Sequence, residues 1–469
     1  MNMSVSEEDK SAQKNDDGKE WPQILAILLG CLSSLTGGLL FAWPSPFLPK
    51  IINDKSYNIT QDEASNFTTF NTVGIIVLSP FLILFTDSFG RKKTLMFSAI
   101  PTSVAWIIKA FSKDLYWLYF ARFSCGLGDA ILFAALPIYI GEVASPKVRG
   151  TWGNALICSV FLGQFIMNVL GYYFSIETTS FICLALPVTF VLVFSLMPET
   201  PYFYMMKGNE EAARQSLRTF KRKHNVDAEF EELKSDVRRQ MVQAGTWRNL
   251  FMIEQNRKGL IAAVFLRTSQ MFGGLLVFAS YTKFIFEKSG GNIDPSLSSI
   301  IYMGTSFSLY TLSAFFSDTF GRRKAYMTSL ALSGLVLLIE GIYLYIDQYQ
   351  PGIDLSGIKW FPLAGLLGFI VTSSFGLGII PTLMLGELFS ASIKAKGVSL
   401  TATNFGLMIL LANVVFYETN KAVGLYGPFI VFGCCNILST FISYFVLPET
   451  KGKTLDEIQQ HLKTEKVWK

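Results

Sequence analysis

Two short stretches of the chain carry a carboxylate, a glycine and three cations in the same order. Residues 85–93 read Phe-Thr-Asp-Ser-Phe-Gly-Arg-Lys-Lys, and residues 316–324 read Phe-Ser-Asp-Thr-Phe-Gly-Arg-Arg-Lys. Such groups can form ion pairs around a tight turn. Because the cations do not readily enter a bilayer, both turns are expected on the cytoplasmic side of a membrane. One copy would fit any basic loop between membrane helices, but Asp318 repeats Asp87 after 231 residues. The repetition predicts a duplicated transporter.

Two further features recur in both halves. Each half has a Gly-Glu pair with a basic residue seven positions after the acid, and each half ends in Pro-Glu-Thr. The carboxylates could pair with the arginines of the turns when the cytoplasmic side is closed and separate when it opens, although ordinary loop solvation would use the same residues. The expected cytoplasmic gate comprises Asp87, Arg91, Glu142, Arg149, Glu199, Asp318, Arg322, Glu387, Lys394 and Glu449.

The composition excludes several classes of protein. Of the 469 residues, 51% are hydrophobic and only 16% are charged, which is too little polar surface for a soluble globule of this size. No cluster has metal-ligand spacing and no nucleophile–base pair stands out, so we expect no enzyme, no metal and no cofactor. The net charge of +5 comes from short loops and one polar insert and does not indicate nucleic-acid binding. The six cysteines lie in apolar runs, which argues against a disulfide framework.

Apolar runs of about 20 residues, the length that spans a bilayer, recur on both sides of a polar insert. Six spans are expected before the insert and six after it, at 22–48, 64–86, 94–112, 115–140, 151–173, 179–197, 258–287, 298–317, 325–346, 360–385, 398–417 and 427–447. The predicted domains are an N-terminal tail (1–21), an N-terminal bundle (22–197), a helical linker (198–257), a C-terminal bundle (258–447) and a C-terminal tail (448–469).

Lysine and arginine concentrate in the insert, the tails and every second loop. The positive-inside rule therefore places both termini and the insert in the cytoplasm, and we expect a multi-pass protein of the plasma membrane that works as a monomer. The lipid bilayer and a small-molecule solute are the expected partners. The sequon at Asn58 lies in the first loop of the opposite side, where it can be glycosylated.

Several motifs resemble those of the sugar porter branch of the major facilitator superfamily. The similar signatures are Arg122-x-x-x-Gly126-x-Gly128 with Pro137-x-Tyr139-x-x-Glu142, then Pro198-Glu199-Thr200-Pro201, and finally residues 448–455. Within the branch, residues 42–46 and 386–389 are similar to insect facilitated trehalose and glucose transporters. The resemblance implies an all-α membrane protein whose twelve transmembrane helices form two pseudo-symmetric six-helix bundles around a central cavity. It also implies alternating access to that cavity.

A sugar site requires amides for paired hydrogen bonds and a ring to cover the apolar face of the sugar. The resemblance implies that Gln164 and Gln270 line the cavity, whereas helix–helix hydrogen bonding is the alternative. The chain departs from the family pattern where Ser269, Leu275 and Thr382 replace a glutamine, an asparagine and a tryptophan. The expected substrate-binding residues are Gln164, Ser269, Gln270, Thr382, Asn404 and Phe405. The departures weaken the expectation of sugar specificity more than that of transport.

Asp129 and Arg267 are expected at membrane depth, where ionisable residues are functional candidates. They could face each other across the cavity, or Arg267 could attract an anionic group. The alternative is that each charge neutralises a local neighbour, which for Asp129 would be Arg122, two helical turns away.

We expect a facilitative uniporter of a sugar such as trehalose or a hexose. Proton-linked members of the family carry an aspartate on the first span, and here the corresponding place is near Pro44. That difference favours facilitated diffusion, while Asp129 keeps proton symport of a sugar or other small polar solute open. A non-transporting, receptor-like relative is the third hypothesis.

Overall fold

The computed structural model describes residues 19–242, 246–316, 321–350, 352–390, 393–451, 453 and 455–464, which are helical with no strand among them. Residues 1–18 of the predicted N-terminal tail lie outside the described residues, as does the predicted gate residue Asp318.

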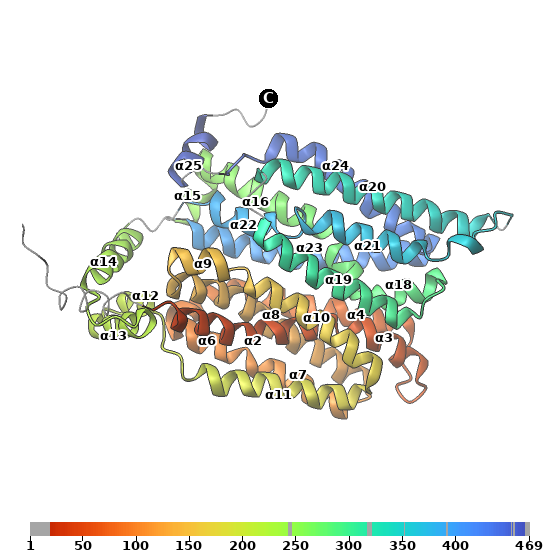
Figure 1. The fold of residues 1–469 in the computed structure, drawn as a ribbon, viewed down its shortest axis with the longest axis horizontal. Coiled ribbons are helices and arrows are strands. Elements are labelled where there is room, and N and C mark those ends of the chain that lie inside the picture. The colour runs from red at the N-terminus through yellow and green to blue at the C-terminus, as the bar shows by residue number, and fades with distance from the viewer. Residues whose placement is uncertain are drawn as a thin grey trace, which may run out of the picture.

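The N-terminal half packs into one bundle, drawn red to yellow in Figure 1. Several of its helices begin at residues whose side chains cap them: Thr60 and Glu63 form a capping box, and Asp114 accepts hydrogen bonds from two backbone amides. The helices are α2 (Trp21–Ala42), α3 (Pro44–Asn53), α4 (Gln61–Leu78), η1 (Ser79–Phe81), α5 (Leu82–Phe89), α6 (Arg91–Phe97), α7 (Ala99–Phe111), α8 (Leu115–Val143), α9 (Pro146–Trp152), α10 (Ala155–Tyr173) and α11 (Ile176–Phe194).

A linker of short helices joins this half to the second bundle, drawn green to blue in Figure 1. The linker helices are α12 (Pro201–Met206), α13 (Glu210–Lys221), α14 (Asp227–Val242) and α15 (Trp247–Met252). The second half contains α16 (Glu254–Phe272), α17 (Leu275–Ser280), α18 (Thr282–Ser289), α19 (Pro295–Phe316), α20 (Arg322–Tyr349), η2 (Ser356–Ile358), α21 (Phe361–Ser374), α22 (Ile380–Leu388), α23 (Lys394–Val423), α24 (Tyr426–Val446) and α25 (Leu455–Thr464). We call the end of the molecule that carries the linker and α25 the linker end, and the opposite end the far end (Figure 1).

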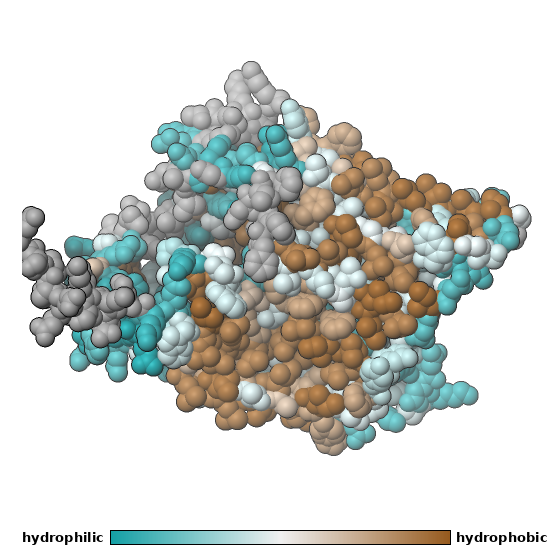
Figure 2. Space-filling model, in the orientation of Figure 1, coloured by the Kyte–Doolittle hydropathy of each residue, from teal (hydrophilic) through white to brown (hydrophobic). Residues whose placement is uncertain are grey.

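The surface of the molecule carries an apolar belt. Large apolar side chains such as Leu84, Leu192 and Phe441 are exposed. Figure 2 shows hydrophobic residues over the middle of the visible face and hydrophilic residues towards both ends. A bilayer would cover such a belt, whereas a soluble protein rarely exposes so large an apolar surface.

Ten helical stretches among the described residues are long and apolar enough to cross a membrane, and each coincides with a predicted span. The other two predictions, 64–86 and 298–317, correspond to α4 with its continuation through η1 and α5, and to α19. Both helices pack against the other half, α4 on α23 and α19 on α10. These two carry many serine, threonine and asparagine residues. A helix packed against protein needs a less continuous apolar surface than one surrounded by lipid.

The two halves contact each other along these two helix pairs. The Phe161 ring of α10 stacks on the Tyr310 ring of α19 with centroids 4.0 Å apart. At the far end, Asp62 of α4 accepts from the Tyr417 hydroxyl and, at 2.8 Å, from Lys421 Nζ of α23. Further along α4, a buried bond also crosses between the halves, with the Thr68 and Tyr281 hydroxyls 3.1 Å apart. The far end is therefore closed by contacts that cross from one half to the other.

Within the N-terminal bundle, α4 and α8 approach each other through glycine. A Cβ added at Gly126 would lie 1.9 Å from the Asn71 carbonyl oxygen, and one added at Gly74 would lie 2.3 Å from the Phe123 carbonyl oxygen. These are backbone atoms, so a side chain at either position must push the two helices apart.

We predict that Gly126→Ala lowers the free energy of unfolding by about 1–3 kcal/mol, the usual cost of overpacking. The measurement is the thermal unfolding midpoint of the purified protein in detergent. Gly150→Ala is the matched control, because a Cβ there meets nothing within 4 Å and alanine favours a helix. Equal midpoints for the two variants would contradict the close approach of α4 and α8.

Candidate functional site

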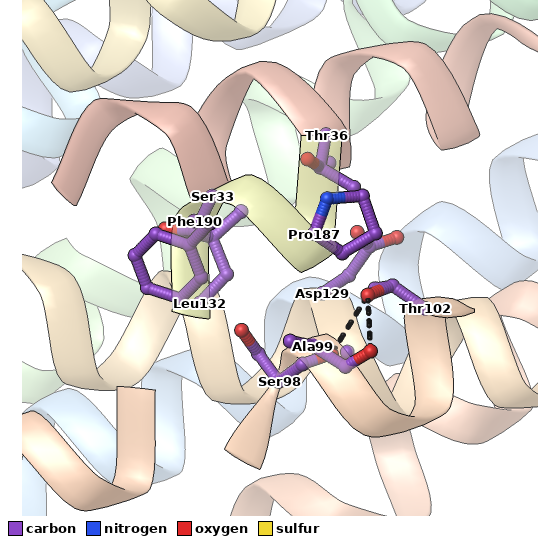
Figure 3. A pocket seen from close by; sticks show the side chains of 11 residues that line it. Ser33, Thr36, Ser98, Ala99, Thr102, Asp129, Leu132, Pro187 and Phe190 are labelled. Atoms are coloured by element: carbon purple, nitrogen blue, oxygen red, sulfur yellow. Dashed lines mark hydrogen bonds between the residues drawn. The ribbon is translucent and has the colours of Figure 1, made fainter. Parts of the chain in front are cut away.

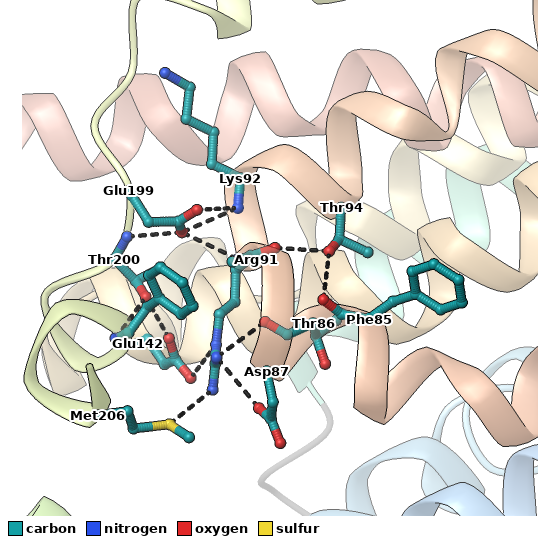
Figure 4. A network of polar contacts seen from close by, with 12 residues as sticks. Phe85, Thr86, Asp87, Arg91, Lys92, Thr94, Glu142, Glu199, Thr200 and Met206 are labelled. Carbon is teal, nitrogen blue, oxygen red and sulfur yellow. Dashed lines mark hydrogen bonds and ion pairs between the residues drawn. The ribbon is translucent and has the colours of Figure 1, made fainter.

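Arg91 is the centre of a charge cluster at the linker end of the N-terminal half (Figure 4). Its Nε lies 3.0 Å from Glu142 Oε1, and its Nη1 lies 3.2 Å from Asp87 Oδ1. Glu199 takes a different part: it accepts hydrogen bonds from the backbone amides of Arg91, at 3.1 Å, and Lys92, at 3.0 Å. The Arg91 guanidinium is thus bound by Glu142 and Asp87, whereas Glu199 binds the main chain.

The position of Glu199 has a physical cause in the start of α6. The first amides of a helix have no partner within the helix and carry its positive dipole end, and no local side chain caps α6. Gly90 precedes α6 with φ of 98°, and a Cβ there would lie 2.3 Å from Glu199 Oε2. The glycine of the basic turn therefore makes room for a carboxylate that caps α6 from a distant part of the chain.

Thr200 connects this cluster to the linker. Its hydroxyl accepts from the Phe203 amide at 3.2 Å, which caps α12, and donates to Glu142 Oε2 at 2.5 Å. The Pro-Glu-Thr motif thus fixes the start of α6, the end of α8 and the start of α12 to one another.

The C-terminal half repeats the same geometry. Glu449 accepts from the backbone amides of Arg322 and Arg323 at 2.9 and 3.2 Å, and Arg322 Nη2 lies 3.7 Å from Glu387 Oε1. The Thr450 hydroxyl donates to Glu387 at 2.6 Å. We call the cluster of Asp87, Arg91, Glu142, Glu199 and Thr200 the N-clamp, and that of Arg322, Glu387, Glu449 and Thr450 the C-clamp.

The two remaining gate candidates that the structure describes, Arg149 and Lys394, donate to backbone carbonyls. Arg149 Nη2 donates to the Gly141 carbonyl at 2.5 Å, and Lys394 Nζ donates to the Gly386 carbonyl at 3.0 Å. Each base therefore caps the end of the helix that carries the clamp glutamate. The spacing of these residues in the sequence identified them as a group. It did not indicate the backbone partners of Glu199, Glu449, Arg149 and Lys394. The glycine before each arginine and the recurrence of Pro-Glu-Thr were the available signals.

Three residues from three helices of the C-terminal half gather around Arg267 of α16. Its Nη1 donates to Gln270 Oε1 at 2.8 Å and to the Thr382 hydroxyl of α22 at 3.3 Å. Its guanidinium carbon lies 5.0 Å from the centre of the Phe405 ring of α23. Three predicted substrate-binding residues, Gln270, Thr382 and Phe405, are therefore brought together around a cation.

The other predicted substrate-binding residues lie elsewhere. The Ser269 hydroxyl is buried and lies 2.7 Å from the Tyr326 hydroxyl, inside the C-terminal bundle. Asn404 bonds to α16 through Thr268 Oγ1 at 3.4 Å. Gln164 on α10 is 1% exposed, and its Oε1 has no hydrogen-bond partner among the described residues.

Asp129 is enclosed within the N-terminal bundle (Figure 3). It accepts from Asn71 Nδ2 at 3.1 Å, while its Oδ1 has no partner in the described part of the chain. The small cavity beside it is lined by α2, α7, α8, α11 and the junction of α6 and α7, with the hydroxyl-bearing residues Ser33, Thr36, Ser98 and Thr102. Its volume of about 10 Å³ suits a single water molecule.

Two buried cations accompany Asp129 in the same bundle. Arg122 donates from Nε to the Phe67 carbonyl at 2.9 Å and from Nη1 to the Leu40 carbonyl at 2.6 Å. Lys109 Nζ lies 4.5 and 4.7 Å from the ring centres of Trp43 and Trp106. Both cations are close enough to interact electrostatically with Asp129.

We predict that Glu199→Ala destabilises the protein by about 1–3 kcal/mol, because it leaves the first amides of α6 without their cap. Glu199→Gln, which keeps an accepting oxygen without the charge, should lose less. The measurement is the thermal unfolding midpoint in detergent, with the exposed Glu231→Ala in the linker as the matched control. A Glu199→Ala midpoint equal to that of the control would contradict the capping role.

Comparison with known proteins gives a consistent result. Residues 23–462 match the family described as "Sugar (and other) transporter". The chain is 31% identical over 451 residues to the facilitated trehalose transporter Tret1 of Polypedilum vanderplanki, covering 94% of this chain and 88% of that one. It is 30% identical to trehalose transporter 1 of Drosophila melanogaster, again over 94% of this chain but only 52% of the relative, so it spans about half the length of that protein.

Solved structures confirm the predicted fold class. The proton:xylose symporter XylE, solved with 6-bromo-6-deoxy-D-glucose, superposes with a TM-score of 0.77 at 18% identity, covering 95% of this chain and all of that one. The inward-open xylose transporter XylE from E. coli gives 0.75 at 17% identity, covering 94% and 99% of the two chains. The fold is the twelve-helix major facilitator fold. The chain belongs to the sugar transporter family.

Proposed function

We propose that the protein is a facilitative uniporter of a small hydroxylated solute, a sugar such as trehalose or a hexose in the first instance. The observation that carries the proposal is the pair of matching clamps. Each clamp joins helices of one half only, so each half can move as a rigid unit around a solute held between them. The names of the similar trehalose transporters support both the mode of transport and the solute.

The linker end is proposed to face the cytoplasm of a plasma-membrane protein that acts as a monomer. Arg91 and Arg322 of the clamps lie at this end, together with Lys92 and Lys394, which supports a cytoplasmic position under the positive-inside rule. Asn58 is exposed in the loop between α3 and α4 at the far end, which supports its glycosylation on the outer side. Since the relatives are transporters, the chain is not an enzyme.

The charges at the linker end favour separation of the halves there. Arg149 and Lys394 belong to opposite halves and are close enough for their charges to interact. Like charges repel, whereas the far end is held by the bonds of Asp62 to Tyr417 and Lys421. We therefore assign the structure to the part of the cycle that is closed towards the outside.

Proton symport is the second candidate, favoured by the enclosed Asp129 with its unpartnered oxygen. Proton-linked members of the family carry an aspartate on the first span, and the corresponding place in this chain is near Pro44, which favours uniport. Uniport is therefore the better supported function.

We predict that purified protein in liposomes equilibrates a radiolabelled hydroxylated solute down its gradient, at a rate that does not change when a pH gradient is imposed. Counterflow of the labelled solute is the measurement, with protein-free liposomes as the control. Acceleration by an inward proton gradient would establish symport instead, and solute binding without counterflow would indicate a receptor-like protein.

We predict that Lys394→Glu slows counterflow about two- to fivefold, because attraction to Arg149 then holds the linker end closed by the ~0.2–1 kcal/mol typical of exposed pairs. Arg149→Glu should act likewise, and the double variant should recover because its like charges repel again. Raising the salt concentration should weaken both single effects. A double variant slower than either single variant would contradict this role.

A further inference from the structure

Arg267 is a cation at mid-depth of the predicted membrane region. It lies 13 residues, or about 20 Å, along α16, within the candidate membrane span Glu254–Ser280. Moving a charge to this depth is costly unless an opposite charge or water compensates it. The question is therefore which group compensates the positive charge of Arg267.

The three residues that hold Arg267 are uncharged. Gln270 and Thr382 share its Nη1, and Phe405 lies beneath the guanidinium plane. Among the described residues no carboxylate pairs with Arg267, and the only titratable group close enough to act on its charge is the Tyr326 hydroxyl. Glu340 on α20 is a buried acid of the same half. It packs against Gly365, and neither of its carboxylate oxygens has a hydrogen-bond partner within the described residues.

The N-terminal half provides a contrast. There, Asp129 lies close enough to Arg122 and Lys109 for their charges to interact inside the bundle. Arg267 belongs to the other half, and its hydrogen bonds among the described residues stay within that half. Arg267 is therefore a membrane-depth cation with no carboxylate partner in the described part of the chain.

The free edge of Arg267 has the geometry of a carboxylate receptor. Both of its hydrogen bonds use Nη1, and Nε and Nη2 are not among the buried atoms that lack a partner. The side chain is partly exposed, so this edge is open to water or to a ligand. The parallel Nε–H and Nη2–H donors of arginine match the two oxygens of a carboxylate.

We propose that the transported solute is a hydroxylated monocarboxylate, such as a uronic or aldonic acid, whose carboxylate binds Arg267. This inference rests on the proposed transport function and narrows its solute class. Thr382 lies beside the cation and is exposed, so its hydroxyl can meet a hydroxyl of the same solute. Gln270 is buried and donates to the Leu377 and Gly378 carbonyls, so it holds the arginine in place. One arginine matches one negative charge, which favours a monoanion over a phosphate dianion.

The test is counterflow in liposomes that contain the full-length protein, with radiolabelled D-glucuronate, D-gluconate, D-glucose and trehalose. We expect the two acids to be transported in preference to the neutral sugars. Arg267→Gln should reduce uptake of the acids at least tenfold, and Arg267→Lys should restore part of it. Because a uniported anion carries charge, an inside-positive potential set with potassium and valinomycin should increase its accumulation.

Arg257→Gln is the matched control, since Arg257 lies on the same helix but is exposed at the linker end. Transport of neutral sugars alone, unaffected by Arg267→Gln, would overturn the inference and leave the proposed function standing. Absence of any counterflow would overturn the proposed function. In that case glucuronate should still raise the unfolding temperature of the protein in detergent but not that of Arg267→Gln, and failure of this shift would overturn the inference as well.

Discussion

The structure depends on one interaction made twice: a glutamate from the end of each half caps the first helix after the basic turn. Glu199 and Glu449 bind the main-chain amides of Arg91 and Arg322. A carboxylate at a helix N-terminus meets both unpaired donors and the positive end of the dipole. Gly90 and Gly321 are needed because a Cβ at either position would lie within 3 Å of a carboxylate oxygen. The side chains of Arg91 and Arg322, the first cation of each turn, bind Glu142 and Glu387.

Because the bonds of each clamp stay within one half, each half is held as one rigid unit, and the contacts at the boundary between the halves can change. Along that boundary, α4 meets α23 and α10 meets α19. The bonds that cross it at the far end involve the exposed Asp62 and Lys421, and exposed ion pairs are weak and easily exchanged for water. The clamp bonds thus hold each half together, and an exposed ion pair holds the halves against each other at the far end. This division is what alternating access requires.

The apolar runs predicted the spans, the resemblance to the family predicted the fold class, and the repeated motifs identified the charged residues of both clamps but not Thr200 and Thr450. The sequence was insufficient to predict partners, because spacing identifies residues that share a helix end but not the atom each will contact. Ser269 follows the family position of a sugar ligand, yet its hydroxyl meets Tyr326 inside the bundle. Asp129 and Arg267 were candidates for a pair across the cavity, yet each lies within its own half. Rotation of a helix about its axis decides such contacts, and the apolar runs of a membrane protein specify that rotation poorly.

The most direct test of two rigid halves is a pair of distances measured by electron spin resonance on labelled cysteines, in a background without the native cysteines. Labels at Lys93 and Lys147, both in the N-terminal half, report on the N-clamp, and labels at Tyr116 and Gly357 report across the far end. The account predicts that a transported solute leaves the first distance unchanged and shifts or broadens the second. A change in the first distance with a constant second distance would contradict it.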